Sequence, residues 1–580
     1  MKGKPIPTRT TETAHEMSAP DGSSPATEAA CALLDALVTL GVRHIVVSPG
    51  SRSQALALAA ANLERTERVR LHVRIDERSA GFTALGIGRE TRVPAAVICT
   101  SGTAAANLLP AALEAHHSGI PLLLLTADRP PELRGVGANQ TTDQPSLFSS
   151  FARLAIDAPV PDGSAWPAHE LAARVFVAAA GESVQGVAHL DLPFREPLAG
   201  ELPEWFRSGR ARDADAVIAQ ARAMLPDPPR PTVLDRGPRT IVVAGADAGD
   251  DAEILAHQGG WPLVAEIVSG SRYGALAVAG YRAALADPHL GGRVERVIVV
   301  GHPTLQRETA RLLARDDLDI IALAGAGEAL DLNGSTRVAH AVQIAPGEVD
   351  EAWLHAWRVH GRQHAIDLEP PAPDSAGLAS TDPKTRLGAV RAELEAVRTP
   401  LDRAQLVAGV WRATWPHDRL LFGSSRLVRV ADDVLRGKKV PVHANRGLAG
   451  IDGTVATGLG IALASQQDGA AGVTRVLLGD LALLHDIGSL LFAEGEPRPR
   501  IQVIVGNDRG GTIFDGLEVA GVADPASMTR VLLTPPSVDF APLAAAYGWE
   551  YVRAETRSEL DVALTAAISG PQLIEVPLER

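Results

Sequence analysis

Short apolar runs alternate with longer amphipathic stretches along most of the chain. Over residues 24–200 the apolar runs include 44–48, 70–75, 95–99 and 121–125, and Ala-rich stretches with helical spacing separate them. Strand-length runs spaced by helices predict a parallel sheet with crossover helices on both faces. The pattern therefore predicts a first doubly wound α/β domain over this region.

The same alternation returns twice along the remaining sequence. A polar, Pro-rich connector is expected at 201–238, and we predict a central α/β domain with flanking linkers over 201–385. A linker is expected at 367–385, and a third α/β domain over 386–580. Residues 1–23 are polar and lack the apolar core of a signal peptide, so a disordered tail is expected there. The predicted fold class is α/β, with three doubly wound parallel-sheet domains.

Composition narrows the classes of protein. The 580 residues are 46% hydrophobic and 21% charged, as in ordinary α/β proteins, and their net charge of −14 argues against nucleic acid as the main partner. No apolar run reaches the roughly 18 residues of a membrane span. The two cysteines, Cys31 and Cys99, lie in apolar runs, which predicts no disulfide framework and a reducing, cytoplasmic location.

Two predicted strand ends carry polar side chains suited to a metal. The apolar run 474–478 leads into Asp480, and the run 501–505 leads into Asn507, which follows Asp480 by 27 positions. If the two strands are adjacent and parallel, both side chains lie at the edge of the sheet where α/β proteins bind ligands. A carboxylate and an amide oxygen suit a hard cation such as Mg²⁺, with Mn²⁺ as a substitute. The segment therefore predicts a magnesium-diphosphate site, although two ordinary βα turns would leave a similar pattern.

The same segment resembles the motif of thiamine diphosphate enzymes, in which GDG precedes an Asn by roughly 25 residues. Leu481 stands where the motif has its second Gly. Three consecutive α/β units also resemble the pyrimidine, central and diphosphate domains of the thiamine diphosphate-dependent decarboxylase/carboligase superfamily. In that superfamily the pyrimidine and diphosphate domains that share one cofactor belong to different subunits, so the resemblance implies a homodimer or homotetramer.

The resemblance also implies roles for individual residues. A Glu after the second strand of the pyrimidine domain faces the aminopyrimidine ring in the superfamily, and Glu77 holds this position here. From position alone, Glu77 could equally be an acidic residue favoured at a helix N-terminus. The other cofactor and metal positions implied are Gly479, Asp480, Leu481, Asn507, Ile451, Ile513, Phe514 and the backbone carbonyl of Arg509.

Several strings together closely resemble one family, the 2-succinyl-5-enolpyruvyl-6-hydroxy-3-cyclohexene-1-carboxylate synthases of menaquinone biosynthesis. The strings are SPGSRS (48–53), IDERSAG (75–81), TSGTAAAN (100–107), TADRPPELR (126–134), GANQ (137–140), PFREPL (193–198), NRG (445–447) and GTIF (511–514). The resemblance covers roughly residues 28–580 and is weakest in the central domain.

This family resemblance implies a transferase that decarboxylates 2-oxoglutarate and adds the resulting succinyl carbanion to isochorismate in a 1,4 sense. The substrate contacts implied are Ser51, Arg52, Arg129, Asn139, Gln140, Arg307, Ser425, Arg429 and Arg446. Five of these nine residues are Arg, whose guanidinium fork suits carboxylates. The family tends to have a Lys before its equivalent of Arg307, whereas this chain has Gln306.

Two other readings of the sequence stay open. The chain could be another 2-oxoacid decarboxylase or an acetolactate-type carboligase of the same superfamily, although enzymes acting on pyruvate need fewer Arg residues. It could also be a cofactor-binding subunit without catalysis. The joint presence of Glu77, Asp480 and Asn507 argues against that second alternative.

Overall fold

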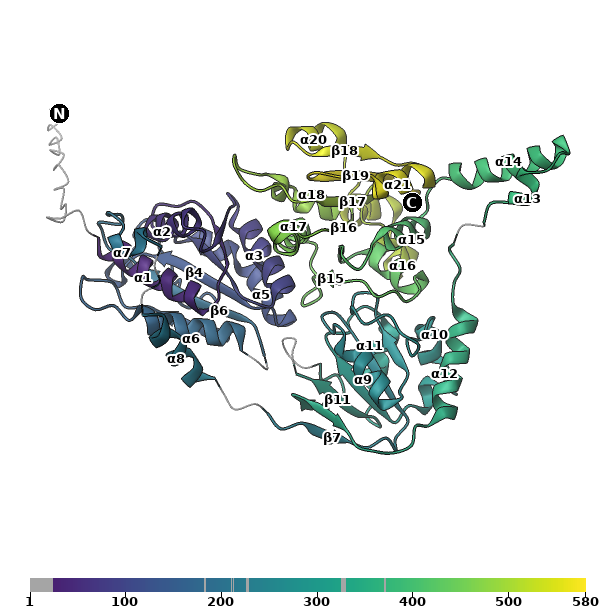
Figure 1. Cartoon of the computed structure of the whole chain (residues 1–580), viewed down its shortest axis with the longest axis horizontal. Helices are drawn as coiled ribbons and strands as arrows, with labels where there is room; N and C mark the ends of the chain where they lie inside the picture. Colours follow the sequence, from purple (N-terminus) through teal and green to yellow (C-terminus); the bar gives the residue numbers. More distant parts are fainter. Residues whose placement is uncertain are drawn as a thin grey trace, which may run out of the picture.

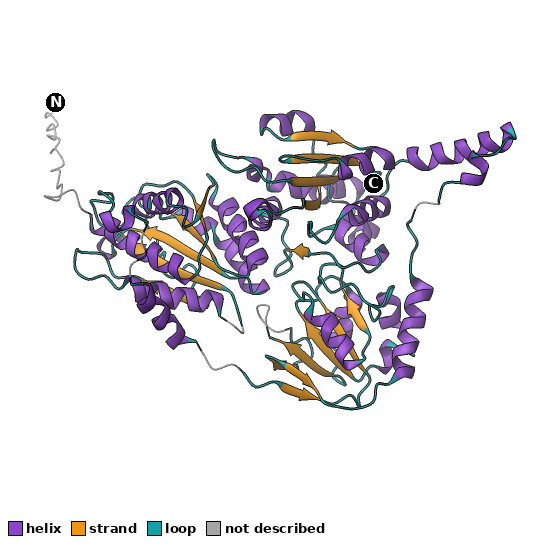
Figure 2. Ribbon diagram, viewed as in Figure 1, coloured by secondary structure: helices purple, strands orange, loops and turns teal. Residues whose placement is uncertain are grey.

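The computed structural model describes residues 24–181, 184–209, 211, 213–225, 229–324, 330–369 and 372–580. The expected disordered tail, residues 1–23, lies outside the described residues. Parallel sheets of six, five and six strands form the framework, and helices surround each sheet (Figures 1 and 2). The predicted α/β class with parallel sheets is confirmed. Among the described residues, no helix combines the length and the apolar character needed to cross a membrane.

The first sheet has the strand order β2-β1-β3-β4-β6-β5, with every pair parallel. Its strands are β1 (His44–Val47), β2 (Arg70–Val73), β3 (Ala95–Cys99), β4 (Leu122–Asp128), β5 (Leu154–Asp157) and β6 (Val187–Pro193). Its main helices are α1 (Pro25–Leu40), α2 (Gln54–Arg65), α3 (Glu77–Thr91), α5 (Leu109–Ser118) and α6 (Ala168–Ala180). Ile45 and Val47 pack in the apolar core beneath α1, α2 and α6, whereas Val46 packs in the core beneath α3 and α5. Alternate strand residues thus bury on opposite faces, which makes the sheet doubly wound.

The segment expected to be a Pro-rich connector, 201–238, is more ordered than its composition suggests. It contains α7 (Glu204–Arg207) and α8 (Ala214–Met224). Phe206 and Val217 from these helices are fully buried in the core beneath α1 and α6. This part of the segment therefore packs with the first sheet, because its apolar side chains complete that core.

The central sheet has the order β12-β11-β10-β8-β9. Its strands are β8 (Thr240–Ala244), β9 (Leu263–Ala265), β10 (Arg296–Val300), β11 (Asp319–Leu323) and β12 (Arg337–Ala339), and β7 (Thr232–Leu234) pairs separately with β13 (Val342–Ile344). Its main helices are α9 (Asp251–Gly259), α10 (Tyr281–Ala286), α11 (Arg307–Leu313) and α12 (Glu351–His364).

The third sheet, β15-β14-β16-β17-β19-β18, has the same strand order as the first when each set is counted from its own start. Its strands are β14 (Arg419–Phe422), β15 (Val442–Ala444), β16 (Thr474–Gly479), β17 (Ile501–Asn507), β18 (Glu550–Arg553) and β19 (Gln572–Pro577). Its main helices are α15 (Arg403–Ala413), α16 (Arg426–Val434), α17 (Thr454–Ser465), α18 (Asp480–His485), α20 (Phe540–Ala546) and α21 (Arg557–Thr565). Before this sheet, α13 (Ser375–Leu378) and α14 (Pro383–Arg398) occupy part of the predicted linker, and α14 projects from the body (Figure 1).

The first and third sheets meet through α3 and α17, which lie side by side (Figure 1). Ser79 of α3 and Ser489 share a hydrogen bond of 2.6 Å between their hydroxyl oxygens. Glu114 of α5 adds a second connection, since its two carboxylate oxygens accept from the backbone N–H groups of Gly447 and Leu448 at 2.9 Å each. These contacts fix the carboxyl edges of the two sheets relative to each other.

Candidate functional site

Asp480 and Asn507 lie next to each other at the carboxyl edge of the third sheet. Gly479 of β16 pairs in parallel register with Gly506 of β17, so the residue after each Gly occupies the same level of the sheet. The two strands are adjacent and parallel, as the sequence predicts. Asp480 is only 1% exposed, and its carboxylate accepts from Leu481 N and Gly510 N at 2.8 Å each. Burial raises the pKa of Asp480 to about 6.

The amide of Asn507 is oriented by its neighbours. Its Nδ2 donates to Oε1 of Glu575 at 2.7 Å, and its Oδ1 accepts from the backbone N–H of Arg509 at 3.2 Å. Arg509 itself adopts a left-handed conformation with φ of 57°. With its amide nitrogen held by Glu575, Asn507 directs its oxygen away from that carboxylate, and the second lone pair of this oxygen can take a cation beside the carboxylate of Asp480. These oxygen donors fit a hard metal ion.

Glu77 begins α3, directly after the N-cap residue Asp76, which accepts from Arg78 N at 2.9 Å. Its side chain is half-buried near the end of β3. Burial and the nearby Glu77 carboxylate both raise the pKa of the Cys99 thiol. Within the described residues, no hydrogen bond or ion pair joins Glu77 to Asp480. Its neighbour Arg78 instead donates to the carbonyl of His485, at the opposite end of α18 from Asp480, at 2.8 Å.

Apolar side chains, and buried polar atoms without a hydrogen-bond partner among the described residues, lie in loops near the carboxyl edges of the first and third sheets. Ile451 packs against the core of the third sheet just before α17. Ile513 and Phe514 lie half-buried in the short helix η5 (Thr512–Gly516). Ser48 Oγ and Asn445 Oδ1 are buried without a hydrogen-bond partner among the described residues. Buried polar atoms of this kind need a partner, and a bound polar cofactor would supply one.

The first group of candidate Arg residues lies at the edge of the first sheet. Arg52 is 7% exposed and donates to the carbonyl of Phe194 at 3.0 Å. Burial lowers the pKa of Arg52, and the neighbouring Arg129 guanidinium lowers it further. Two guanidinium groups close enough to repel each other form a site that an anionic ligand would stabilise. Ser51 is exposed beside them.

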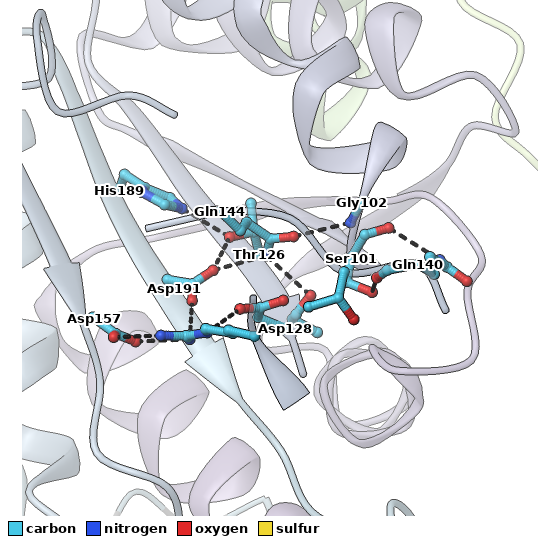
Figure 3. Close-up of polar contacts among 12 residues, drawn as sticks. Ser101, Gly102, Thr126, Asp128, Gln140, Gln144, Asp157, His189 and Asp191 are labelled. Atoms are coloured by element: carbon cyan, nitrogen blue, oxygen red, sulfur yellow. Dashed lines mark hydrogen bonds and ion pairs between the residues drawn. The ribbon is translucent and has the colours of Figure 1, made fainter. Parts of the chain in front are cut away.

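Asn139 and Gln140 belong to an exposed loop that is clamped at two points (Figure 3). Gln140 Nε2 donates to Ser101 O at 3.0 Å, and Ser101 Oγ donates to Gln140 O at 2.9 Å. Gln144 accepts from Gly102 N at 3.0 Å through Oε1 and donates to Asp191 Oδ1 at 2.7 Å through Nε2. The loop is therefore held against the turn that follows β3.

Close to this loop lies an acidic cluster formed by Asp128, Asp157 and Asp191 (Figure 3). Arg134 forms ion pairs with Asp128 at 2.8 Å, with Asp157 at 2.6 Å and with Asp191 at 2.9 Å. The side chains of Asp128 and Asp191 are fully buried. Burial raises the pKa of both carboxyls, and the charge of Asp128 raises the pKa of Asp191 further. The cluster connects the ends of β4, β5 and β6 to the loop that carries Asn139.

The second group of Arg residues lies where the central domain meets the third sheet. Arg446 is 4% exposed and donates to Thr304 O at 2.9 Å, and Arg429 donates to Ser425 O at 2.9 Å. Burial lowers the pKa of Arg429 and of Arg446. The charge of Arg307 adds to the effect on Arg429, and that of Arg429 adds to the effect on Arg446. The three guanidinium groups are therefore neighbours.

Arg307 and its neighbour Gln306 have partners of a different kind. Arg307 is exposed and forms an ion pair with Glu518 at 2.9 Å, as an Arg with no role in a site commonly does. It nevertheless lies beside Arg429. Gln306 is buried, and its Nε2 donates to Asp432 Oδ2 at 2.7 Å. The residue that replaces the family's usual Lys thus links the central domain to α16.

The sequence alone did not identify three charged residues that hold the loops of the two Arg groups in place. They are Glu114, Arg134 and Glu266. Most of their partners come from segments remote in sequence, which no local pattern reveals. Glu266 carried the clearest signal, because it is a charged residue directly after the buried strand β9.

Comparisons with known proteins identify two domains of this chain. Residues 27–147 match the family described as thiamine pyrophosphate enzyme, N-terminal TPP binding domain, and residues 436–576 match the corresponding C-terminal TPP binding domain. These two matches contain Glu77 and Asp480, respectively. The chain is therefore a thiamine pyrophosphate enzyme with both cofactor-binding domains.

Curated relatives extend over nearly the whole chain. The chain is 51% identical to the 2-succinyl-5-enolpyruvyl-6-hydroxy-3-cyclohexene-1-carboxylate synthase of Leifsonia xyli subsp. xyli (strain CTCB07), over 97% of this chain and 98% of the relative. It is 52% identical to the synthase of the same name from Clavibacter michiganensis subsp. michiganensis (strain NCPPB 382), with the same coverage. A third, from Kineococcus radiotolerans, is 41% identical over 96% of both chains. The chain belongs to the 2-succinyl-5-enolpyruvyl-6-hydroxy-3-cyclohexene-1-carboxylate synthase family.

Proposed function

We propose that this chain decarboxylates 2-oxoglutarate and adds the four-carbon succinyl unit to isochorismate, giving 2-succinyl-5-enolpyruvyl-6-hydroxy-3-cyclohexene-1-carboxylate. The observation that carries the proposal is the presence of two separate groups of Arg residues in an acidic protein. One contains Arg52 and Arg129, and the other contains Arg307, Arg429 and Arg446. Two dianionic substrates need two such groups, whereas a pyruvate-specific carboligase does not.

The cofactor site has a proposed role for each of its residues. Asp480, Asn507 and the carbonyl of Arg509 would hold Mg²⁺, with Mn²⁺ as a substitute, beside the backbone of Gly479 and Leu481. Ile451, Ile513 and Phe514 would supply apolar contacts that keep water from the reacting atoms. When bound, thiamine diphosphate supplies a thiazolium that stabilises negative charge on the carbon that loses CO₂.

Glu77 is the proposed acid–base residue. Its carboxylate would exchange a proton with a ring nitrogen of the aminopyrimidine, which requires only that it face the ring. Its half-buried position at the start of α3 leaves the carboxylate free for this contact, since no described residue hydrogen-bonds to it.

The two Arg groups would bind and orient the carboxylates of the substrates. Arg52 and Arg129 act with Ser51, Asn139 and Gln140 at the edge of the first sheet. The second group, Arg307, Arg429 and Arg446, acts with Ser425. Guanidinium forks hold carboxylates in fixed orientations, and fixed orientation is what an addition between two bound substrates requires.

Self-association into a homodimer or homotetramer is part of the proposal. In such an assembly Glu77 would act on a cofactor bound to Asp480 of a second copy, in keeping with the lack of a described contact between these residues within one chain. Exposed apolar side chains near the site support an interface there. Ile75 is 68% exposed, Val136 68% and Leu448 55%.

We also propose a cytoplasmic location. Its support is the pair of cysteines, Cys31 and Cys99, which are both buried and unpaired. Unpaired cysteines are usual in reducing compartments.

The decisive test uses the purified full-length chain with Mg²⁺, thiamine diphosphate, 2-oxoglutarate and isochorismate, and follows isochorismate loss and product formation. The parallel reaction with pyruvate in place of 2-oxoglutarate should give little product. If folded, cofactor-loaded protein consumed no isochorismate, the proposal would fail. Activity measured across a sizing column should coincide with the dimer or tetramer, and an active monomer would contradict the shared site.

A further inference from the structure

Glu266 is a fully buried carboxyl placed directly behind the second Arg group. It follows β9 and is 0% exposed. Its Oε1 accepts from Leu305 N at 2.7 Å and its Oε2 accepts from Thr304 N at 3.3 Å. Both donors belong to the loop that follows β10. Glu266 therefore fixes the backbone of this loop.

The same loop holds Arg446. The Nη2 of Arg446 donates to the carbonyl of Thr304 at 2.9 Å and to its hydroxyl at 3.1 Å. The Nε of Arg446 is buried without a partner among the described residues. Glu266 also acts on the group through charge, since its carboxylate raises the pKa of both Arg446 and Arg429. One buried carboxyl thus lies close enough to act on both the buried Arg446 and the half-buried Arg429.

Other charged and titratable groups face Glu266 from three further elements. They are Arg446 after β15, Arg429 and Asp432 of α16, and Tyr281 of α10, with Arg272 paired to Asp432 at 2.9 Å. Burial raises the pKa of Glu266 to about 8, the charge of Asp432 adds to this rise, and Arg446 opposes it. The carboxylate of Asp432 is already satisfied by Arg272, Tyr281 and Gln306. Among the described residues Glu266 forms no ion pair, and its pKa of about 8 places its change of charge just above neutral pH.

We infer that Glu266 is a positioning residue whose ionised carboxyl, present at alkaline pH, balances the charge of Arg446 and Arg429 in the substrate-free protein, and that this carboxyl takes up a proton when a substrate carboxylate binds to these guanidinium groups. The inference rests on the proposed function, in which this group binds the carboxylates of 2-oxoglutarate. The proton comes from solvent, and no covalent bond forms or breaks. The substrate carboxylate then balances the positive charge of the guanidinium groups, so the carboxyl of Glu266 becomes neutral.

The physical consequence is a coupling between substrate affinity and pH. A bound anion raises the proton affinity of Glu266, and by linkage protonation of Glu266 strengthens binding of the anion. Below about pH 7 the carboxyl is already protonated, so affinity should change little with pH. Above about pH 8 binding requires proton uptake, so affinity should fall by up to about tenfold per pH unit.

Calorimetry on the holoenzyme tests the inference directly. The probe is glutarate, which has the two carboxylates of 2-oxoglutarate but no keto group to react. Titrations at about pH 8 in phosphate and in Tris should give different apparent enthalpies, and the difference divided by the difference in buffer ionisation enthalpy should correspond to the uptake of up to about half a proton per site. Equal apparent enthalpies in the two buffers, before any correction for buffer ionisation and with clear binding of glutarate, would overturn the inference. If neither glutarate nor 2-oxoglutarate bound, the proposed function would fail instead.

The variant Glu266→Gln provides the second arm. It resembles the protonated carboxyl in shape and charge, so KM for 2-oxoglutarate should vary less than about twofold between about pH 7 and about pH 9. The matched control is Asp319→Asn, which removes a central-domain carboxylate paired with Arg296 and Arg337 at the opposite end of the sheet. This control should keep the pH dependence of the unmodified protein. If KM depended on pH in the same way in Glu266→Gln and in the unmodified protein, the role of Glu266 would be contradicted. The calorimetric experiment uses the unmodified protein, so it tests the inference even if the variant does not fold.

Discussion

Gly86 of α3 and Gly460 of α17 bring two helices from different sheets into backbone contact. A Cβ placed on Gly460 would lie 3.0 Å from the Cα of Gly86 and would overlap the carbonyl of Thr83. A Cβ placed on Gly86 would likewise overlap the carbonyl of Thr457. Because neither Gly has a side chain, α3, which begins with Glu77, can pack directly against α17 of the third sheet. The position of Glu77 depends on this contact.

Replacing Gly460 by Ala should destabilise the protein by about 1 to 3 kcal/mol, because the backbone on both sides of the contact is rigid and has to move apart. Urea unfolding followed by fluorescence measures the change, and turnover should fall with it as α3 shifts. Gly388→Ala is the matched control, since Gly388 lies on exposed α14 with no atom within 4 Å of an added Cβ. That substitution should stabilise by about 0.5 to 1 kcal/mol. Equal effects of the two changes would show that helix contact is not the cause.

Replacing Glu77 by Gln should lower turnover by roughly 10² to 10⁴-fold, because an amide cannot exchange a proton with the aminopyrimidine. Affinity for thiamine diphosphate and Mg²⁺, measured by fluorescence quenching, should change little. Asp76→Asn is the control, since Asn is an equally good N-cap and preserves the start of α3. It should keep most of the activity. A Glu77→Gln variant with full activity would exclude the proposed role.

Replacing Glu575 by Ala should weaken metal-dependent cofactor binding by about 10- to 100-fold, as changes to residues that orient metal ligands usually do. The change frees the amide of Asn507, which Glu575 holds at 2.7 Å. The measurement is the Mg²⁺ concentration needed for half-maximal thiamine diphosphate binding. Tyr551→Phe removes only the other hydrogen bond of Glu575, at 2.5 Å, and should have a much smaller effect. Similar losses in both variants would indicate a general disturbance of β19.

The buried pair Asp128 and Asp191 should make stability depend on pH. The pKa of Asp191 is raised in the folded protein, so the folded state binds a proton more tightly than the unfolded state. The free energy of unfolding should therefore decrease as pH rises above the usual carboxyl range of about 4. Asp191→Asn should remove this part of the slope in urea unfolding between about pH 5 and about pH 8.

The control for this pair is Asp157→Asn, which removes the exposed carboxylate of the same Arg134 cluster. It should leave the slope of stability against pH in place, because Asp128 and Asp191 remain. A slope that persisted in Asp191→Asn would assign the effect to other groups.

Local patterns were sufficient to place Asp480 and Asn507, the residues of the proposed metal site. Alternation of strands and helices predicted parallel strands, and parallel strands align their carboxyl ends, so the sequence alone placed these two residues at one edge of the sheet. The register of Gly479 with Gly506 agrees with that placement. Composition was less reliable at 201–238, where prolines obscured the amphipathic pattern of α8.

The charge network behind the two Arg groups could not be predicted in the same way. Arg134 and Asp191 are 57 positions apart, and Glu266 and Leu305 are 39 apart. Buried charges require partners, but the sequence does not say which partner lies near, because that choice depends on how the sheets and loops pack.

The sequence by itself therefore determined the fold class, the motif residues and the types of ligand that they suit, since these follow from periodicity and from the chemistry of single side chains. The tertiary structure decided the close approach of Gly86 and Gly460, the division of the Arg residues into two groups, and the position of Glu266 behind one of them. Each of these depends on distances between segments remote in sequence, and those distances are set by core packing rather than by local preference.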